Sequence, residues 1–273
     1  LHDALPIYYP FLSSSANHIV DLSACYSTAS HCSGASSTQN AKKINIYNQD
    51  ALYFNGVENQ KIRRFPHDGD FTGTTTATAS QSPKIDEAFL INITRLLSKD
   101  EIKKGTFTLE LWTSASYDTP FHTRIYLKDS DGPNAFKVNS QRGEYGILYA
   151  SNSAGTPKDG SSSAQGSPAG LLYYQAGHVV LSASVFGSLL SSSIGLDLSM
   201  SSDGMKVDTL LTGSSISGAC DALRHRIYNL SFNNTTELNT TVYFCRANHN
   251  EFNYSTNPTY LTGSKMRVKT FEG

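Results

Sequence analysis

The chain has 273 residues and a net charge of −1 at pH 7, and only 16% of its residues are charged. This near-neutral balance lacks the cationic excess that phosphate binding requires, so we expect no nucleic-acid partner. The longest apolar runs are broken by Gly, His, Gln and Ser, so none of them predicts a membrane span. The chain is weakly charged and has 15 Tyr and 13 Phe against a single Trp and three Met, a composition that favours β-sheet over helix.

The first seven residues, LHDALPI, have an unusual composition for a natural N-terminus. Read back into codons, they fit CTA CAC GAC GCT CTT CCG ATC, which resembles the end of a short-read sequencing adapter. We interpret residues 1–7 as a translated adapter and exclude them from the fold, as one excludes a cloning scar. The alternative is an ordinary N-terminal tail. The adapter interpretation predicts a reading frame that is cut at its 5′ end.

The N-terminal part combines a loose segment with one expected strand. Residues 8–42 are Ser-rich and weakly patterned, with a strand predicted at HIVDLS. Residues 43–56, KINIYNQDALYFNG, alternate between apolar and polar side chains, which predicts a further strand. The pair Asn55-Gly56 is a turn signal at its end.

Residues 84–113 contain the clearest local pattern. The run AFLINITRL predicts a strand because it is apolar and β-branched. A short helix is predicted over about 98–104, with Ser98 as N-cap, Glu101 completing a capping box and Gly105 ending it.

The run TFTLELW that follows alternates as a strand. Alternation places its side chains on two faces. One face carries Phe107, Leu109 and Leu111. The other carries Thr106, Thr108, Glu110 and Trp112.

The second half repeats the β pattern around one helix. Strands are predicted within residues 121–140 and 143–155, and two more are predicted on either side of Gly177. Apolar residues at helical spacing predict an amphipathic helix over about 216–227. The segments IYNLSF, NNTTELN and TVYFCR are expected to form a hairpin.

These elements predict a mainly β fold, an antiparallel β-sandwich or barrel-like domain or domains with one or two short helices. Residues 43–150 and 169–273 are each expected to form a β-rich domain or half-domain, separated by the Gly/Ser loop 151–168. The ending KMRVKTFEG has no closing element, so we expect truncation at the C-terminus as well.

The four cysteines do not form a metal-binding pattern. His31 beside Cys32 in CYSTASHC is half of a zinc site, but a second compact pair is missing, so we predict no metal. A disulfide between Cys220 and Cys245 is one alternative. Buried free thiols are the other, because a free cysteine behaves as a small apolar residue.

The search for catalytic patterns also gives no site. The chain has no nucleophile elbow, no phosphate-binding loop and no HExxH helix. In DSDGPN, Asp129, Asp131 and Asn134 have a spacing that loosely resembles a calcium loop. A calcium loop needs more oxygen ligands and a bidentate acid further along the chain, so we interpret the segment as a tight turn. His178 is interpreted as a strand residue. We therefore predict no catalytic residue, no cofactor and no enzymatic activity.

Several segments together resemble a known family: KINIYNQ, LLSKDEIKKG, GEYGILYASNSAG, AGLLYYQAGHVVLSASVF and FCRANHNEFNYSTNPT. The chain is similar over most of residues 43–269 to virion structural proteins of marine T-even-type tailed phages, including cyanophages. The resemblance implies a tail-associated protein of the virion that forms oligomers with other virion proteins and has no catalytic residues to carry over. It also implies further strands beyond RVK.

The exposed contact segment is predicted to be residues 247–263, because this segment is rich in Asn and Tyr, which make adaptable polar contacts. An alternative is that this loop packs across its own domain. The alternative function is that of a β-sandwich binding module of a tail fibre or adhesin, which recognises a glycan or protein on the host surface and so has a host surface receptor as its partner. The candidate interaction residues are Asn248, His249, Asn250, Glu251, Phe252, Asn253 and Tyr254.

Overall fold

The computed structural model describes residues 19–34, 39–69, 71, 84–152, 168–187, 196–246, 256–263 and 265–266. The chain divides into two compact units, Leu1–Thr236 and Glu237–Gly273. The first unit contains the main sheet and the helices α1 to α5. The second contains, among its described residues, the short helix η6 (Pro258–Tyr260) and the hairpin of β16 (Leu261–Thr262) and β17 (Lys265–Met266).

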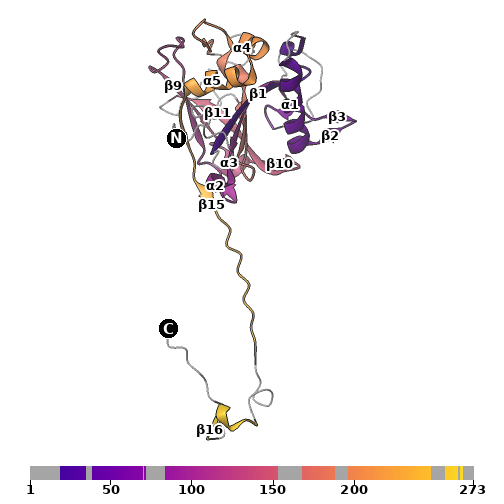
Figure 1. The fold of residues 1–273 in the computed structure, drawn as a ribbon, viewed down its shortest axis with the longest axis vertical. Helices are drawn as coiled ribbons and strands as arrows, with labels where there is room; N and C mark the ends of the chain where they lie inside the picture. The colour runs from indigo at the N-terminus through magenta and orange to yellow at the C-terminus, as the bar shows by residue number, and fades with distance from the viewer. Residues whose placement is uncertain are drawn as a thin grey trace. The chain divides into compact units, whose positions relative to one another are not determined.

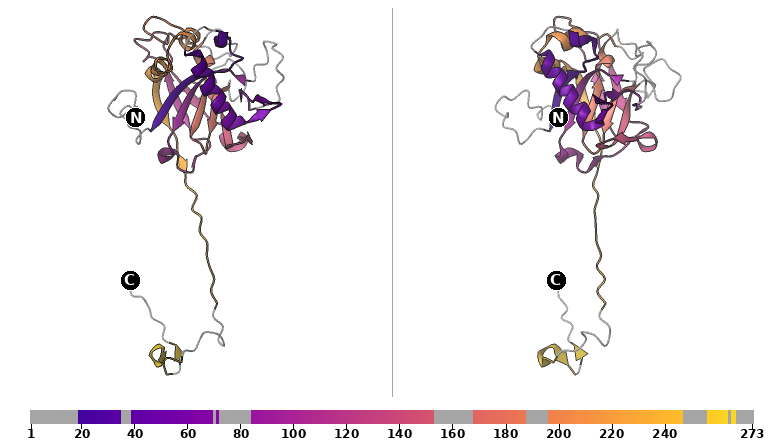
Figure 2. Two further views of the ribbon diagram at one scale, coloured as in Figure 1. Left: turned by 45° about the vertical axis from the view of Figure 1, so that its right-hand side comes forward. Right: turned by 90° about the vertical axis from the view of Figure 1, so that its right-hand side faces the viewer.

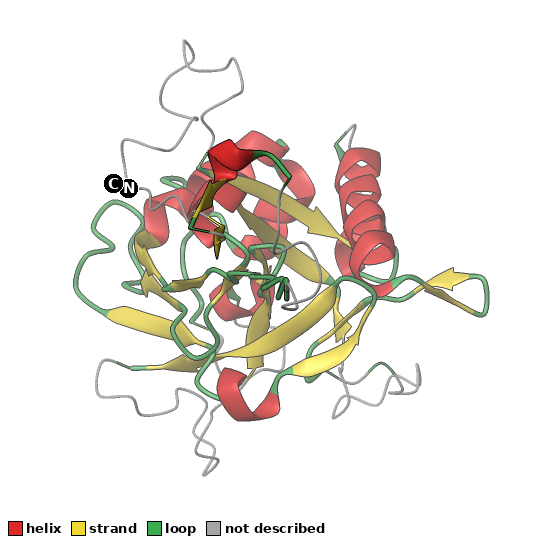
Figure 3. Ribbon diagram, turned by 90° about the horizontal axis from the view of Figure 1, so that it is seen from below, coloured by secondary structure: helices red, strands yellow, loops and turns green. Residues whose placement is uncertain are grey.

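One antiparallel sheet forms the centre of the first unit (Figures 1 and 2). Its strand order is β1-β6-β13-β12-β11-β9-β8-β14, and β10 (Lys137–Ser140) pairs with β11 off this path. The sheet curls into a half-barrel, as Figure 3 shows from below. The expected mainly β class is therefore confirmed, in its barrel-like form. The strands are β1 (Val20–Tyr26), β6 (Glu87–Ile93), β8 (Thr108–Trp112), β9 (Arg124–Lys128), β11 (Gly143–Ser151), β12 (Pro168–Tyr173), β13 (His178–Ser182) and β14 (Ile227–Ser231).

Among the described residues of the first unit, three pairs of two-residue strands lie outside this sheet. Strands β2 (Val57–Glu58) and β3 (Lys61–Ile62) form a hairpin whose turn residues both have positive φ. The other two pairs join segments that are distant in sequence. They are β4 (Phe65–Pro66) with β5 (Lys84–Ile85), and β7 (Glu101–Ile102) with β15 (Asn234–Thr235).

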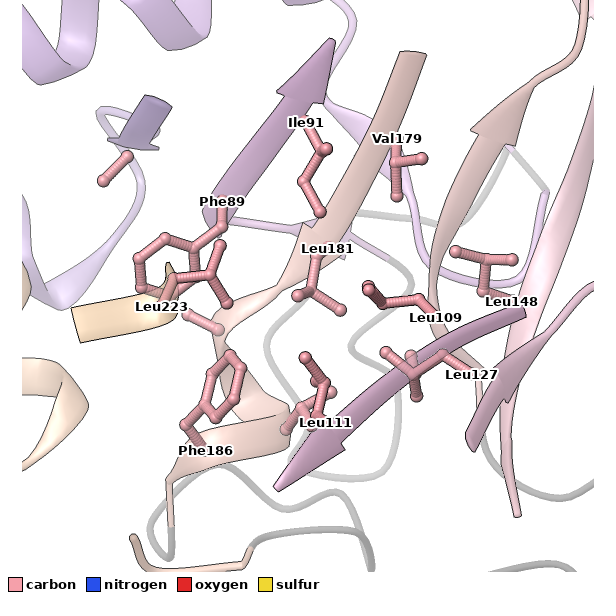
Figure 4. Packing of buried hydrophobic residues seen from close by; sticks show 14 of the residues in the cluster. Phe89, Ile91, Leu109, Leu111, Leu127, Leu148, Val179, Leu181, Phe186 and Leu223 are labelled. Carbon is pink, nitrogen blue, oxygen red and sulfur yellow. The ribbon is translucent and has the colours of Figure 1, made fainter. Parts of the chain in front are cut away.

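Both faces of the central strands are buried. On β6, Phe89 and Ile91 belong to the cluster that α4 (Val207–Gly213) and α5 (Ile216–Arg226) cover, whereas Leu90 belongs to a second cluster with α1. Figure 4 shows the first cluster, in which Phe89 meets Phe186 edge to face with ring centroids 5.7 Å apart. Burial on both faces explains why these strands read as continuous apolar runs rather than as an alternation.

The helix over 216–227 is confirmed as α5, Ile216–Arg226. Ser215 is its N-cap, and the Ser215 hydroxyl accepts a hydrogen bond from the Gly218 N–H at 3.1 Å. Three basic residues occupy the last turn, where the helix dipole favours positive charge. Helix α5 packs against β1, beside which it is drawn in Figure 1.

The strand predicted over residues 43–56 is wrong, because this segment forms helix α1, Asn40–Asn55. The alternation of KINIYNQ covers only its first turns. The buried residues Tyr47, Ala51 and Phe54 instead recur at helical spacing and pack on the second cluster. Gly56, with a φ of 73°, ends the helix and is not the turn of a hairpin.

The helix predicted over about 98–104 is also wrong. Helix α2 spans Arg95–Ser98 and so ends where the prediction begins. Lys99 has a φ of 57°, which interrupts the helix, and Glu101 lies in β7. The capping box does not form because Ser98 is buried and its hydroxyl donates back to the Thr94 carbonyl. Gly105, expected to end this helix, has a φ of 77° but lies in a turn before β8 and not at the end of a helix.

The hairpin expected after residue 227 takes another form. IYNLSF forms β14, but its partner is β8 and not TVYFCR. Residues 236–246 have no regular secondary structure. The segments 43–150 and 169–273 both contribute strands to the single main sheet, since β12 and β13 lie between β6 and β11.

Two short helices and two helical turns complete the described elements. Helix α3 (Gly132–Ala135) follows β9, and α2 follows β6. The turn η4 (His31–Gly34) follows β1, and η5 (Ala183–Phe186) follows β13.

Candidate functional site

The outer surface of strands β8, β9 and β14 carries a cluster of aromatic and polar side chains, which we call the aromatic face. It consists of Glu110, Trp112, Phe121, Arg124, Tyr126, Tyr228 and Asn229. The register pairs Trp112 with Arg124 and Glu110 with Tyr126, so their side chains are cross-strand neighbours. The alternation predicted for TFTLELW, which separates Trp112 from Leu111, is thus confirmed.

Arg124 is the centre of the aromatic face. Its guanidinium lies 4.4 Å from the ring centroid of Tyr228 and 5.4 Å from that of Trp112, within the range of cation–π attraction. It donates a hydrogen bond to Glu110 at 2.9 Å, and the Asn229 amide donates to the same carboxylate at 3.2 Å. These contacts hold the rings in fixed orientations before any ligand binds.

A register shift in β14 produces this arrangement. Ile227 pairs with Leu111, and the next regular pair is Asn229 with Glu110, so Tyr228 occupies a bulge. A bulge redirects a side chain and increases the local twist of the strand. Tyr228 is 51% exposed and Phe121 56% exposed, so this surface offers ring faces to a partner.

A separate cavity of about 510 Å³ lies between α1, β6 and β13. His178 is buried against it, with its ring stacked on Phe54 at 4.5 Å between centroids. Its Nδ1 contacts the Asn92 side-chain oxygen, and its Nε2 lies 3.4 Å from an Asp50 carboxylate oxygen. The guanidinium of Arg142 lies over the Tyr53 ring at the same cavity.

Burial sets the charges in this cavity. It lowers the pKa of His178 to about 3 and raises the pKa of Asp50 to about 6. An imidazole with so low a pKa is a weak base at neutral pH, which does not favour proton abstraction here. The strand position predicted for His178 is confirmed in β13.

Replacing Asp50 by asparagine is expected to stabilise the protein at pH 7 by about 1–3 kcal/mol, because a raised carboxyl pKa means that the charged form opposes folding. The free energy of unfolding of the wild type falls by this amount as pH rises from about 4, the ordinary pKa of an Asp carboxyl, through the raised pKa of about 6. The asparagine variant has no charge at this position and does not show this fall. The difference between variant and wild type should therefore vanish below pH 4. Urea unfolding at several pH values measures it.

The control for this experiment is Asp203→Asn, at an exposed position, which should leave the pH profile unchanged. An Asp50→Asn profile parallel to that of the wild type would contradict the expectation.

The DSDGPN segment forms the tight turn predicted for it. The Gly132 N–H donates to the Asp129 carbonyl at 2.8 Å. The Asp129 carboxylate is fully buried and accepts hydrogen bonds from the N–H groups of Gly105 and Phe107. This carboxylate thus holds the loop before β8 and does not face a ligand.

The cysteines follow the free-thiol alternative in part. Cys25, Cys32 and Cys220 are buried and free, whereas Cys245 is free and exposed. Cys220 donates to the Leu22 carbonyl and is not paired with Cys245.

The predicted interaction residues 248–254 lie outside the described residues. The described positions 256–260 of the same segment are exposed. The aromatic face cannot be predicted from the sequence, although the alternation places Trp112 and Glu110 on one side of their strand. The partners of these residues, Arg124 and Tyr228, come from other strands, and no local pattern shows which strands are neighbours.

The fold defines the chain as a mainly β protein with an antiparallel half-barrel. Comparison with protein-family models, with curated proteins and with solved structures gives no match. None of the helices in the described part of the chain has the length and apolar character needed to cross a bilayer.

Proposed function

We propose that this chain is a non-enzymatic structural protein of a phage virion, associated with the tail, that acts by assembling with other copies of itself and with other virion proteins. The resemblance of its sequence to virion structural proteins supports the phage assignment. The observation that carries the assembly role is the segment 237–246, which we call the apolar arm.

The apolar arm exposes large apolar side chains to an unusual degree. Leu238, Val242, Tyr243 and Phe244 are between 68% and 94% exposed. Every residue from 237 to 246 is exposed and outside regular secondary structure. The run TTVYFC has high β-propensity, and extended segments of this kind add to the sheet edges of partners. Burial of such side chains provides a driving force for association of about 25 cal/mol per Å².

The assembly proposal predicts that serine at Val242, Tyr243 and Phe244 together reduces the mass of the purified protein to that of a monomer. The wild type should form a defined oligomer in light scattering coupled to size-exclusion chromatography. The circular dichroism spectrum should not change, since these exposed side chains contribute little to the fold.

The matched control replaces three exposed apolar residues of the first unit, Val57, Leu96 and Val138, with serine. This control should keep the oligomer. Two results together would reject the proposal: a wild-type protein that is monomeric in solution, and the absence of its peptides from mass spectrometry of purified phage particles.

A second function, binding of a glycan on the host surface, is favoured by the aromatic face. Sugar rings stack on exposed aromatic rings, and Glu110 and Asn229 can hydrogen-bond to hydroxyls. A glycan-array signal that Trp112→Ala and Tyr228→Ala abolish, and that Tyr53→Ala retains, would support this role. A signal that depends on Tyr254 alone would place binding in the 247–263 segment instead.

A further inference from the structure

Four side chains capable of metal binding converge at one end of β1 and β6. His31 and Cys32 lie in η4, directly after β1, and Glu87 is the first residue of β6. Asp208 lies in the first turn of α4, which packs against η4. The sequence separates these residues by up to 177 positions, counted from 31 to 208.

The turn that carries His31 and Cys32 is fixed by its own serines. The Ser30 hydroxyl accepts a hydrogen bond from the Cys32 N–H at 2.9 Å. The Ser33 hydroxyl donates to the Thr28 carbonyl at 3.1 Å. The Ser-rich sequence therefore holds the two donors in one orientation.

The distances within the cluster are close to those between ligands of one ion. The ligand atoms of His31, Cys32 and Glu87 all lie within 4.8 Å of one another. His31 Nδ1 lies 3.3 Å from Glu87 Oε1, whereas the Cys32 sulfur lies 3.6 Å from the other ring nitrogen, Nε2, so binding of an ion through Nδ1 requires the Cys32 side chain to turn toward Nδ1. With zinc bonds of about 2.3 Å to sulfur and 2.0–2.2 Å to nitrogen and oxygen, tetrahedral geometry separates two ligands by about 3.4–3.6 Å.

We propose that His31, Cys32 and Glu87 bind one Zn²⁺ ion, and that Asp208 accepts the hydrogen of the other ring nitrogen of His31. Thiolate, imidazole and carboxylate form a donor set that suits zinc. This proposal is independent of the assembly function and replaces the expectation of no metal, which rested on the missing second pair of cysteines or histidines.

Asp208 gives an independent reason to expect a charged partner here. Its Oδ1 is buried and has no hydrogen-bond partner among the described residues, yet it lies 3.5 Å from His31 Nε2. A carboxylate that orients a metal-bound histidine in this way is the usual outer support of a zinc site. Without such a role, burial of this oxygen would be costly.

Burial and exposure also fit a bound ion. Cys32 is fully buried and Glu87 nearly so, whereas the His31 side chain is 54% exposed. An ion can therefore enter past His31 and be held in the interior, with water as its fourth ligand. The ammonium of Lys43, which donates to carbonyls at the end of α4, lies close enough to Cys32 to offset excess negative charge.

An ion pair between a protonated His31 and the two carboxylates is the competing explanation of these contacts. It accounts for the positions of Glu87 and Asp208, and it leaves Cys32 as a buried thiol that hydrogen-bonds with Ser30 and contacts His31. The two explanations therefore differ in whether a metal–thiolate bond forms.

Titration of the full chain with Co²⁺, followed by absorption spectroscopy, distinguishes them. We expect one Co²⁺ per chain, with the visible bands of tetrahedral cobalt and a thiolate-to-cobalt charge-transfer band that excess Zn²⁺ removes. The protein should carry Cys245→Ser, so that the exposed thiol does not bind cobalt. Absence of both bands would overturn the proposal.

Variants then test each ligand. Cys32→Ser should abolish the charge-transfer band, and Glu87→Gln should weaken binding at least as strongly as Asp208→Asn, for which we expect a loss of about 10–100-fold. Glu58→Gln, at an exposed ion pair, is the matched control and should bind like the parent. A band that persists in Cys32→Ser would reject this site.

X-ray absorption at the zinc edge provides a test that needs no ligand variant. The zinc-loaded protein with Cys245→Ser should show one sulfur at about 2.3 Å and nitrogen or oxygen neighbours at about 2.0–2.2 Å. A shell without sulfur would overturn the proposal even if a Cys32 variant failed to fold.

Discussion

Replacing Arg226 by alanine is expected to lower the free energy of unfolding by about 3–5 kcal/mol. Arg226 is fully buried at the end of α5. It donates to the carbonyls of Trp112 and Ser114 at 3.2 and 2.7 Å, and to those of Ser116 and Ser199 at 3.4 and 2.6 Å. Alanine leaves buried carbonyls without donors and creates a cavity, and both effects destabilise.

Urea unfolding monitored by circular dichroism measures this loss. Arg226→Lys should recover only part of it, because one ammonium cannot replace the two nitrogens that reach all four carbonyls. Arg63→Ala, which removes a partly exposed ion pair with Glu58, is the control and should cost less than about 1 kcal/mol. Equal losses in Arg226→Ala and Arg63→Ala would show that Arg226 does not link α5 to these loops.

Replacing Gly170 by alanine should destabilise the protein by about 3 kcal/mol, because the sheet has no room for a side chain at this position. A Cβ at Gly170 would lie 2.4 Å from the Val180 carbonyl oxygen and 3.2 Å from the Leu181 Cα. Both atoms belong to the backbone of β13, so the strand itself must move. Gly170 lies in β12, which is paired on both sides.

Gly213→Ala provides the matched comparison. No atom lies within 4 Å of the position that its Cβ would occupy, and it ends helix α4, so we expect a change below about 1 kcal/mol. The two thermal unfolding midpoints should differ by several degrees. A midpoint for Gly170→Ala that equals that of Gly213→Ala would contradict the close approach of β12 and β13.

Much of the fold can be predicted from local patterns. The strand β8 and the helix α5 are predictable because their periodicity agrees with their burial, and β6, β12 and β13 are predictable as short, continuous apolar runs. A strand is predicted where helix α1 lies because its first residues alternate between apolar and polar side chains. Only the helical spacing of Tyr47, Ala51 and Phe54 indicates its buried face. Tertiary contacts determine the secondary structure of that segment, as they often do when the intrinsic propensity of the residues is weak.

The sites depend on information that a single sequence does not contain. His31 and Cys32 are adjacent and visible as a pair, but Glu87 and Asp208 reach them only through the order of the strands and the packing of α4. The aromatic face has the same limitation, since Tyr228 meets Trp112 through the pairing of β14 with β8. Local periodicity shows which residues share one face of a strand or helix, but it does not show which strands and helices are neighbours in the fold.

The position of β12 and β13 between β6 and β11 has a consequence for synthesis of the chain on the ribosome. When residue 152 has emerged, β6 and β11 each still lack a neighbour that only the later hairpin supplies. These open edges of β6 and β11 can pair with other nascent chains. The hairpin can join β6 to β11 only after Ser182 has left the exit tunnel, so slow translation between these points should favour aggregation.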